Sequence, residues 1–490
     1  MASSTSFASS GTVIIDSELI TYTANSGGTL SGLTRGANGT TAASHSSGDT
    51  VTDASNYFAW NAAASGDIVT APGLWSLDNF GNKLIATIFG GETFEWDSDP
   101  TGATGTRATI LANAPTASSF TLVSAPDRHL IFFGTETTIG TSSTRDEMYI
   151  RFSDQESIDA STSYTPSAIN TAGTQRLADG SKIVGAIRGR DAIYVWTDTA
   201  LFIMRFVGSP FTFSFQQVGT NCGLIGKNAA VEVDGSAYWM SENGFFRYTG
   251  KLESLPCLVE DFVYDDINTI PKQHINAGLN NLFGEVMWFY PNSGADTVNR
   301  MVCYNYLDST PERPVWTTGT LARSAWQDSA VFGKPHASEY DTSSNGTSGS
   351  ATFVQGNTDG VSYYYEHETG LDQIREGATS SITANIQSGD FDIGQQGLQG
   401  DGEFMMKIRR VLPDFLSQTG DARVTLNLKN YPTDAQASSS LGPFTSSTTT
   451  TKIDTRARAR AISLKVDNTS IKQHWKLGTF RLDIQPDGRR

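Results

Sequence analysis

The chain has 490 residues, more than a single hydrophobic core usually holds, so we expect one large domain and one or two smaller ones. Hydrophobic residues make up 38% of it and aromatic residues 10%, which is enough for packed cores. A formal net charge of −16 argues against a protein that binds nucleic acid through basic patches.

Three cysteines, Cys222, Cys257 and Cys303, are too few and too widely spaced for a disulfide framework or a zinc site, and they suggest assembly in a reducing compartment.

Neither a membrane span nor a secretory signal is expected. The most apolar stretch, Ala192–Val207, is interrupted by Thr197-Asp198-Thr199, so it predicts two strands. Residues 1–10 are small and polar, without a basic n-region or an apolar h-region. The 47 glycines and the absence of a long amphipathic helix pattern favour an all-β chain of short strands and tight turns.

The first region, residues 1–55, predicts a small N-terminal β-module. Gly11–Thr23 alternates apolar and polar residues with a period of two, as exposed β-structure does, and a turn follows at Ser26-Gly27-Gly28. The region continues through Leu33–Ala43 and Ser44–Val51.

The second region, residues 56–385, repeats a unit of strand, hairpin turn and strand. Asp234-Gly235 and Asn243-Gly244 are strong hairpin signals, because both central residues of such a turn adopt positive φ. The paired segments are 84–89 with 93–97, 130–133 with 148–152, 183–187 with 192–196 and 201–206, 230–233 with 237–240 and 245–248, 285–290 with 301–306, and 351–354 with 361–365. The first strands of successive units lie roughly 50 residues apart, within the range of propeller blades. The pattern predicts a β-propeller of about six blades, with a Gly/Ser/Thr-rich loop at Asp341–Ser350.

One aromatic residue of this region predicts how two blades meet. Trp196 ends an alternating strand in which Ile193 and Val195 are also apolar. We therefore expect its indole to be buried between neighbouring blades.

The third region, residues 386–490, predicts a smaller β-sandwich-like domain. Short alternating segments recur at sandwich spacing, and a Ser/Thr-rich linker lies among them at Ser438–Thr451. On a strand, a period of two places Arg456, Arg458 and Arg460 on one face. Such a stripe suits contact with a partner's carboxylates. Contact with phosphate and an ordinary solvated face are the alternatives.

Charge is divided unevenly along the chain. Residues 386–490 hold 15 Lys and Arg and 11 Asp and Glu, a net of +4, so residues 1–385 carry −20. An acidic body is the plain expectation for a soluble protein. It also argues against DNA or RNA as a tightly held ligand.

Several segments bring the chain close to a known family. They are Trp75–Gly81, Pro126–Leu130, Arg151–Glu156, Gly219–Gly226, Ser388–Gly394 and Trp475–Arg489. These strand and turn sequences resemble the β-propeller structural proteins at the tail hub of short-tailed bacteriophages, the tail nozzle or packaged-DNA stabilisation family, and the resemblance covers nearly the whole chain. Leu33–Ala43 is similar to small β-modules of several phage tail and fibre proteins.

That resemblance implies a virion structural protein of the phage tail that is not an enzyme. It implies a homohexameric ring below the portal and adaptor proteins, assembled in the host bacterial cytoplasm, whose channel retains packaged double-stranded DNA and passes it during ejection. The implied partners are the other copies in the ring, the portal and adaptor proteins, the tail fibres and the host cell envelope at infection. With other copies as partners, we expect Arg456, Arg458 and Arg460 to form a subunit interface with the acidic propeller of a neighbouring copy. An acidic conduit would repel phosphate, so DNA could slide along it without sequence-specific binding.

The alternative is a receptor-binding or glycan-processing propeller of the tail. Ser76–Gly81 is near a sialidase Asp-box but has its glycine one place late, and a glycosidase's paired carboxylates cannot be singled out among 51 acids. For Cys222 we favour a buried structural thiol over a nucleophile, and for His367 a solvated histidine over a cation ligand. No two of the six histidines have metal-ligand spacing, so we expect no cofactor, metal site or catalytic residue.

Overall fold

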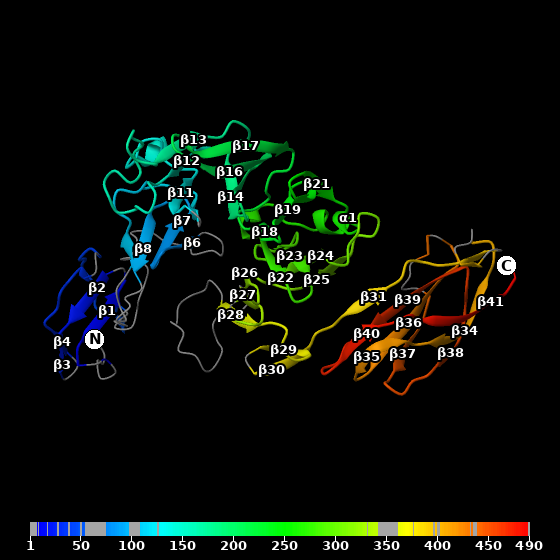
Figure 1. Ribbon diagram of the computed structural model, residues 1–490. Coiled ribbons are helices and arrows are strands. Elements are labelled where there is room, and N and C mark those ends of the chain that lie inside the picture. The colour runs from blue at the N-terminus through cyan, green and yellow to red at the C-terminus, as the bar shows by residue number, and fades with distance from the viewer. Residues whose placement is uncertain are drawn as a thin grey trace. The chain divides into compact units, whose positions relative to one another are not determined.

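The computed structural model describes residues 7, 9–16, 18–26, 29–37, 40–49, 51–53, 75–97, 108–124, 127–330, 332–341, 361–375, 377–394, 397–398, 402–431, 433–434 and 439–488. The chain divides into two compact units, Met1–His367 and Glu368–Arg490 (Figure 1). The described helical structure consists of α1 (Glu260–Tyr264) and the short 3-10 segments Ser142–Thr144 and Lys272–His274. Strands supply the rest of the regular structure, so the predicted all-β class is confirmed.

Six antiparallel sheets follow one another in the first unit, and within each sheet every strand pairs with the next in the chain. Five sheets have four described strands and the sixth has three. The strands are β6 (Trp75–Phe80), β7 (Lys83–Ile88), β8 (Thr93–Asp97) and β9 (Thr109–Ile110); β10 (Phe120–Ser124), β11 (His129–Phe133), β12 (Tyr149–Phe152) and β13 (Gly173–Arg176); β14 (Ile183–Arg188), β15 (Ile193–Thr197), β16 (Ala200–Gly208) and β17 (Thr212–Thr220); β18 (Ala230–Val233), β19 (Ser236–Ser241), β20 (Gly244–Tyr248) and β21 (Leu252–Leu255); β22 (Asn276–Asn280), β23 (Glu285–Tyr290), β24 (Arg300–Asn305) and β25 (Trp316–Gly319); and β26 (Ala325–Gln327), β27 (His336–Asp341) and β28 (Val361–Glu366).

The first strands of these sheets contact one another in chain order, from β6 through β10, β14, β18 and β22 to β26. Successive sheets are thus neighbours along their first strands, as blade-like meanders are. The predicted pairings between residues 84 and 306 are confirmed, as is the turn at Asp234-Gly235. The turn predicted at Asn243-Gly244 lies one residue earlier, at Glu242-Asn243, because Gly244 already pairs with Ser241. The predicted pairing of 351–354 lies outside the described residues, and the described partner of β28 is β27.

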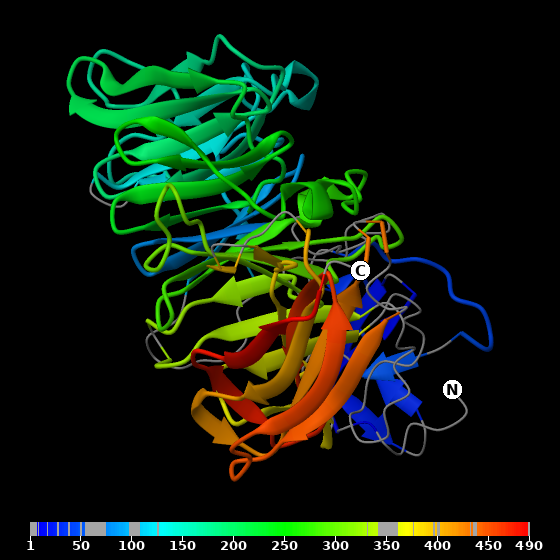
Figure 2. The same cartoon turned by 90° about the vertical axis from the view of Figure 1, so that its right-hand side faces the viewer.

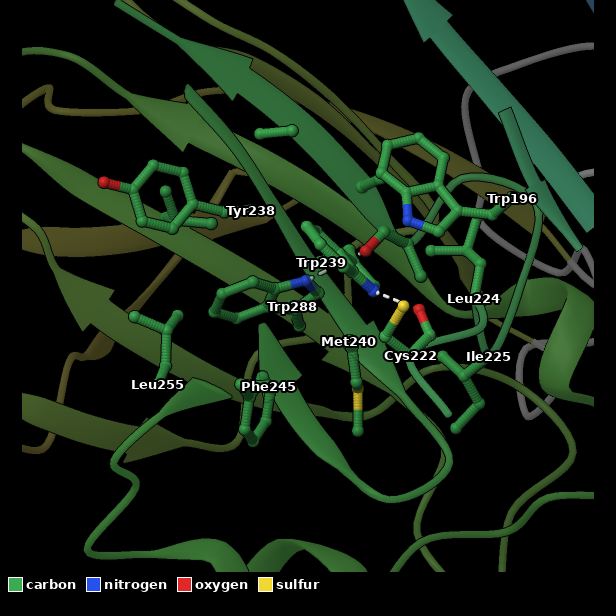
Figure 3. Close-up of a cluster of buried hydrophobic side chains, with 14 of the residues drawn as sticks. Trp196, Cys222, Leu224, Ile225, Tyr238, Trp239, Met240, Phe245, Leu255 and Trp288 are labelled. Carbon is green, nitrogen blue, oxygen red and sulfur yellow. Dashed lines mark hydrogen bonds between the residues drawn. The ribbon is translucent and has the colours of Figure 1, made fainter. Parts of the chain in front are cut away.

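Three tryptophans repeat one packing position on the second strands of adjacent sheets. Trp196 lies on β15, Trp239 on β19 and Trp288 on β23, and all three are fully buried (Figure 3). Each pairs across the sheet with a small residue of the first strand; these are Gly185, Ala230 and Ala277. A small residue opposite each tryptophan leaves room for the indole in a close-packed interior.

Trp196 packs against the next sheet through this position. Its ring centroid lies 5.3 Å from that of Trp239, and both belong to one hydrophobic cluster that extends over three sheets. The prediction that Trp196 is buried between neighbouring repeat units is therefore confirmed.

The N-terminal part of the first unit forms its own small sheet, in the order β2 (Glu18–Tyr22), β1 (Gly11–Ile15) and β5 (Val51–Asp53), beside the hairpin of β3 (Ala24–Ser26) and β4 (Thr29–Ser31). The alternating run Gly11–Thr23 is thus a hairpin followed by the start of a second one. Asp16 lies in the first turn with φ 51°, a left-handed conformation that an aspartate adopts more readily than most residues.

The second unit contains two larger sheets that share one hydrophobic core, which fits the predicted sandwich-like domain. Figure 2 shows its strands in yellow to red. The first sheet consists of β31 (Asn385–Gln387), β39 (Ala461–Asp467), β36 (Ala422–Lys429) and β37 (Ser440–Ser446), and the second of β38 (Ile453–Ala459), β34 (Met406–Leu412) and β41 (Arg481–Pro486). Paired strands complete the unit: β29 (Asp372–Arg375) with β30 (Ala378–Ser381), β32 (Ile393–Gly394) with β33 (Gly397–Leu398), and β35 (Phe415–Thr419) with β40 (His474–Leu477). The strands β29 and β30 precede the boundary that we predicted at residue 386.

Candidate functional site

The predicted arginine stripe is present in part on β38. Residues 453, 455, 457 and 459 of this strand are buried, whereas Arg456 and Arg458 are exposed on its opposite face. The prediction that these two arginines share a face is confirmed. Sheet pleating explains it, because successive side chains of a strand point to opposite sides.

Arg460 does not belong to that face. The chain leaves the sheet after Ala459, and β39 begins at Ala461 in the other sheet. The half-buried Arg460 guanidinium donates to the carbonyl oxygens of Gly402, at 2.7 Å, and Glu403, at 3.4 Å. The prediction of a three-residue stripe was wrong here because one alternating run, 456–464, contains a crossover between two sheets.

The sheet of β38, β34 and β41 carries six cations that are exposed or partly exposed, and we call them the basic sheet residues. They are Lys407, Arg409, Arg410, Arg456, Arg458 and Arg481. The acidic side chains of the same sheet and its immediate continuation are Asp454, Asp483 and Asp487. Positive charge therefore predominates on these three strands.

Two of the basic sheet residues have acidic partners within the unit. Arg410 Nε lies 2.9 Å from Asp454 Oδ1, and Arg458 Nε lies 2.5 Å from Asp487 Oδ2. Hydrogen bonds from Arg410 and Lys452 lower the pKa of Asp454. Arg456 has no ion-pair partner among the described residues, so its guanidinium is available to another molecule.

A cavity of about 680 Å³ lies at turns of three consecutive sheets of the first unit. It is bounded by the β10–β11, β14–β15 and β18–β19 turns and by part of the β16–β17 hairpin. Its charged lining residues are Asp127, Arg188, Arg190, Asp191, Glu232 and Asp234. Ile193, Met204, Phe206 and Phe213 form an apolar wall. An apolar wall with a few convergent polar groups is typical of small-ligand sites.

Side chains cross the space between non-adjacent sheets near this cavity. Arg188 at the end of β14 donates to both carboxylate oxygens of Asp78 on β6, each at 2.9 Å, and to the carbonyl of Val123 at 3.2 Å. Lys227 Nζ donates to the carbonyl oxygen of Trp75 at 2.9 Å. Burial lowers the pKa of Lys227 to about 8. These bonds join residues 110 and 152 positions apart, so no local sequence pattern could have indicated them.

The catalytic alternatives gain no support from these positions. Burial raises the pKa of Cys222 to about 11, which keeps the thiol protonated and favours its structural interpretation. Asp78, in the segment near an Asp-box, accepts the backbone N–H of Val123 at 2.7 Å in addition to its bonds with Arg188. Both residues therefore have roles in packing.

His367 differs from the solvated histidine that we predicted. Its Nε2 accepts a hydrogen bond from Arg323 Nε at 2.8 Å, and its ring centroid lies 4.6 Å from that of Trp326. Burial, followed by the nearby Arg323 charge, lowers its pKa to about 4. The flanking glutamates suggested a solvated strand position, whereas the packing against Trp326 determines the environment.

No helix in the described residues combines the length and apolar character needed to cross a membrane. No protein-family model and no curated protein sequence matches the chain.

Solved structures with related architecture share little sequence with the chain. A putative 6-phosphogluconolactonase from Bacteroides fragilis is 10% identical, with 68% of this chain and 88% of that chain covered and a TM-score of 0.36. An ancestral GH74 enzyme is 8% identical, with 74% of this chain and 48% of that chain covered and a TM-score of 0.35. BamB from Moraxella catarrhalis is 12% identical, with 54% of this chain and 79% of that chain covered and a TM-score of 0.28. These similarities are too distant to indicate a function.

Proposed function

We propose that this chain is a non-enzymatic structural protein of the tail of a short-tailed bacteriophage. In this proposal the six sheets of the first unit form a six-bladed propeller, and six copies of the chain form a ring below the portal and adaptor proteins. The ring retains packaged double-stranded DNA and conducts it at ejection, with tail fibres and the host cell envelope as further partners. The sequence segments that resemble tail nozzle proteins are the reason for this choice of family.

The distribution of charge is the observation that carries the proposal. Residues 1–385 hold a net charge of −20, whereas the basic sheet residues lie on one sheet of the second unit. Charge of opposite sign on two parts of one chain suits a head-to-tail contact between copies, which closes into a ring when the rotation permits. The exposed Arg456, with no acidic partner in the described part of its own unit, is a candidate contact.

The bonds between non-adjacent sheets support a channel formed by several copies. Arg188 and Lys227 reach from the third sheet and the segment after it to the first sheet. Hydrogen-bonded side chains thus occupy the space between the first strands of one copy. Because this space is crossed by side chains, we place the passage for duplex DNA between copies, in the centre of a ring whose acidic walls repel phosphate.

Electron microscopy of the purified full chain tests this proposal. Class averages should show closed rings with a central opening wide enough for duplex DNA. Monomers or open trimers at all protein concentrations would overturn it. Mass photometry at several salt concentrations supplies the copy number independently of particle orientation.

The cavity favours a second candidate, a receptor-binding or glycan-processing propeller of the tail. Its lining combines carboxylates, such as Glu232, with the aromatic wall of Phe206 and Phe213. Binding to purified bacterial surface polysaccharides, with release of reducing ends as the readout for hydrolysis, would identify this function. Loss of binding in Glu232→Gln would assign it to the cavity, and no binding by the wild type would remove the candidate.

A further inference from the structure

Three potential metal ligands meet at one end of the small N-terminal sheet. Asp16 lies in the β1–β2 turn, and His45 and Asp49 lie in the segment between β4 and β5. One donor atom from each of the three side chains lies within 4.8 Å of the other two. Among the described residues, this is the one group of three or more His, Cys, Asp and Glu side chains with such a geometry.

A buried glutamate fixes the orientation of the histidine. Glu18 on β2 has a fully buried side chain, and Arg35 Nε and Nη2 each donate to one of its two carboxylate oxygens at 2.6 Å. The backbone N–H groups of Gly36, at 2.8 Å, and Ala43, at 3.0 Å, also donate to it. In this bidentate pair with the Arg35 guanidinium, with backbone donors on both oxygens, the Glu18 carboxylate acts as the acceptor of every one of these hydrogen bonds.

The carboxylate of Glu18, paired with Arg35, determines which nitrogen of His45 carries a hydrogen. His45 Nε2 lies 2.8 Å from Glu18 Oε2, so Nε2–H is the donor. The Nδ1 lone pair of the neutral ring then points at Asp16, whose Oδ2 lies 2.9 Å away. A histidine that donates one ring N–H to a carboxylate while the other nitrogen stays open is the usual arrangement of a metal-binding histidine.

The contact between Nδ1 and Asp16 requires a positive species between two lone-pair donors. A proton can supply it, since Nδ1 and Asp16 Oδ2 lie at hydrogen-bonding distance. A metal ion can replace that proton after a small separation of the two atoms, because ligand atoms bound to Zn²⁺ at 2.0–2.1 Å in a tetrahedron lie about 3.3 Å apart. Asp49 supplies a third ligand oxygen, and its carboxylate is oriented by the backbone N–H of Ser46 at 2.5 Å.

We propose that Asp16, His45 and Asp49 bind a divalent transition-metal ion of the Zn²⁺ or Mn²⁺ type, with Glu18 as the outer partner of His45. One imidazole and two carboxylates suit such ions better than Mg²⁺, which prefers an octahedron of oxygen ligands. The bound ion links the β1–β2 turn to the segment before β5, two parts of the chain that are otherwise joined at this end through Glu18. This inference is independent of the proposed function in the phage tail.

Calorimetric titration of the metal-stripped, tag-free full chain with ZnCl₂ tests the inference. The wild type should bind one Zn²⁺ at this site, and its melting temperature should rise with the concentration of the ion. Asp49→Asn and Asp16→Asn should each weaken binding at least tenfold, since both keep the Glu18–Arg35 anchor. Asp421→Asn, which alters an exposed carboxylate of the second unit, should bind as the wild type does.

Two further measurements distinguish metal binding from protonation of His45 alone. Binding should release protons, detected as a dependence of the apparent enthalpy on the ionisation enthalpy of the buffer. The His45 ring signals should shift on addition of Zn²⁺ and change much less with Mg²⁺. No uptake of Zn²⁺ at about 100 µM, or equal binding by the wild type and Asp49→Asn, would overturn the inference and leave a proton as the species held by Asp16 and His45.

Discussion

Trp196 and Trp239 occupy the same position in adjacent sheets but differ in one hydrogen bond. The indole N–H of Trp239 donates to the carbonyl oxygen of Cys222 at 2.8 Å, a bond drawn as a dashed line in Figure 3. The indole nitrogen of Trp196 is equally buried and has no acceptor within the described part of the chain. A buried donor without an acceptor costs about 1–3 kcal/mol, so the two residues should respond differently to the same substitution.

We expect Trp239→Phe to destabilise the first unit more than Trp196→Phe does. Both changes remove similar volume, but only Trp239→Phe deprives the Cys222 carbonyl of its donor, while Trp196→Phe removes an unsatisfied N–H. The free energy of unfolding, measured by urea denaturation with circular dichroism, should differ by about 1–3 kcal/mol between the variants. Trp196→Ala should cost about 3–5 kcal/mol through cavity formation. An unchanged midpoint for Trp196→Ala would contradict the packing described for this residue.

Lys227 should make the stability of the first unit depend on pH. Its pKa is about 8 in the folded chain and near 10.5 when unfolded, so the folded state carries a desolvation cost below pH 8. Between these two values the unfolded chain binds more protons, and stability should rise with pH. Lys227→Met should therefore stabilise the protein at pH 7, by about 1–2 kcal/mol once the lost bond to Trp75 is included.

The melting temperature at pH 7 and pH 9.5 measures this effect. The difference between Lys227→Met and wild type should shrink at the higher pH, whereas Lys251→Met, at an exposed position, should show no such change. A constant difference between the two pH values would show that the ammonium of Lys227 is solvated in the folded protein.

Duplex DNA should not bind tightly to the assembled protein. The net charge of −20 on residues 1–385 repels phosphate, and no counterion release is available along an acidic wall. In an electrophoretic mobility assay at about 150 mM salt, we expect no retardation at protein concentrations of about 10 µM. Affinity at about micromolar level that falls steeply with salt would contradict the proposed role as a DNA conduit. If the Arg456→Glu variant lost this affinity for DNA, the basic sheet residues would be identified as the site that contacts phosphate.

Local patterns predicted the strands and hairpins of the first unit because they are short-range signals. The turn at Asp234-Gly235 needs two residues with positive φ, and Trp196 needs only the alternation of its own strand. The same alternation was misleading where it continued through a turn, as at Asp16, or through a crossover between sheets, as at Arg460. The alternation of apolar and polar residues indicates which side chains are buried, but it does not show where one strand ends and the next begins.

Clusters assembled from distant segments were beyond the reach of such patterns. His45 meets Asp16 across 29 residues, so a search for histidine pairs at metal-ligand spacing could not identify their contact. The bond of Arg188 to Asp78 likewise depends on how the third sheet faces the first. Such contacts follow from the arrangement of whole sheets, which the spacing of residues along the chain does not specify.

Reversal of one charge on β38 should separate assembly from folding. Arg456 is exposed and has no ion-pair partner in the described residues, so Arg456→Glu should leave the fold of the second unit intact. Arg460 is unsuitable for this purpose, because its guanidinium holds the carbonyls of Gly402 and Glu403. If Arg456 meets an acidic blade of a neighbouring copy, the glutamate places like charges in contact, at a cost of several kcal/mol.

The variant should therefore show normal circular dichroism but fail to form rings in electron microscopy. The proposed wild-type ring should weaken as salt is raised, because screening reduces the attraction between exposed charges. Lys476→Glu is the matched control, since it makes the same change of charge at an exposed position on β40, in a different sheet of the same unit. If both variants formed normal rings, Arg456 would not be an interface residue, and its side of β38 would face solvent. Loss of rings in both would point to net charge, and only the selective loss in Arg456→Glu assigns the contact to β38.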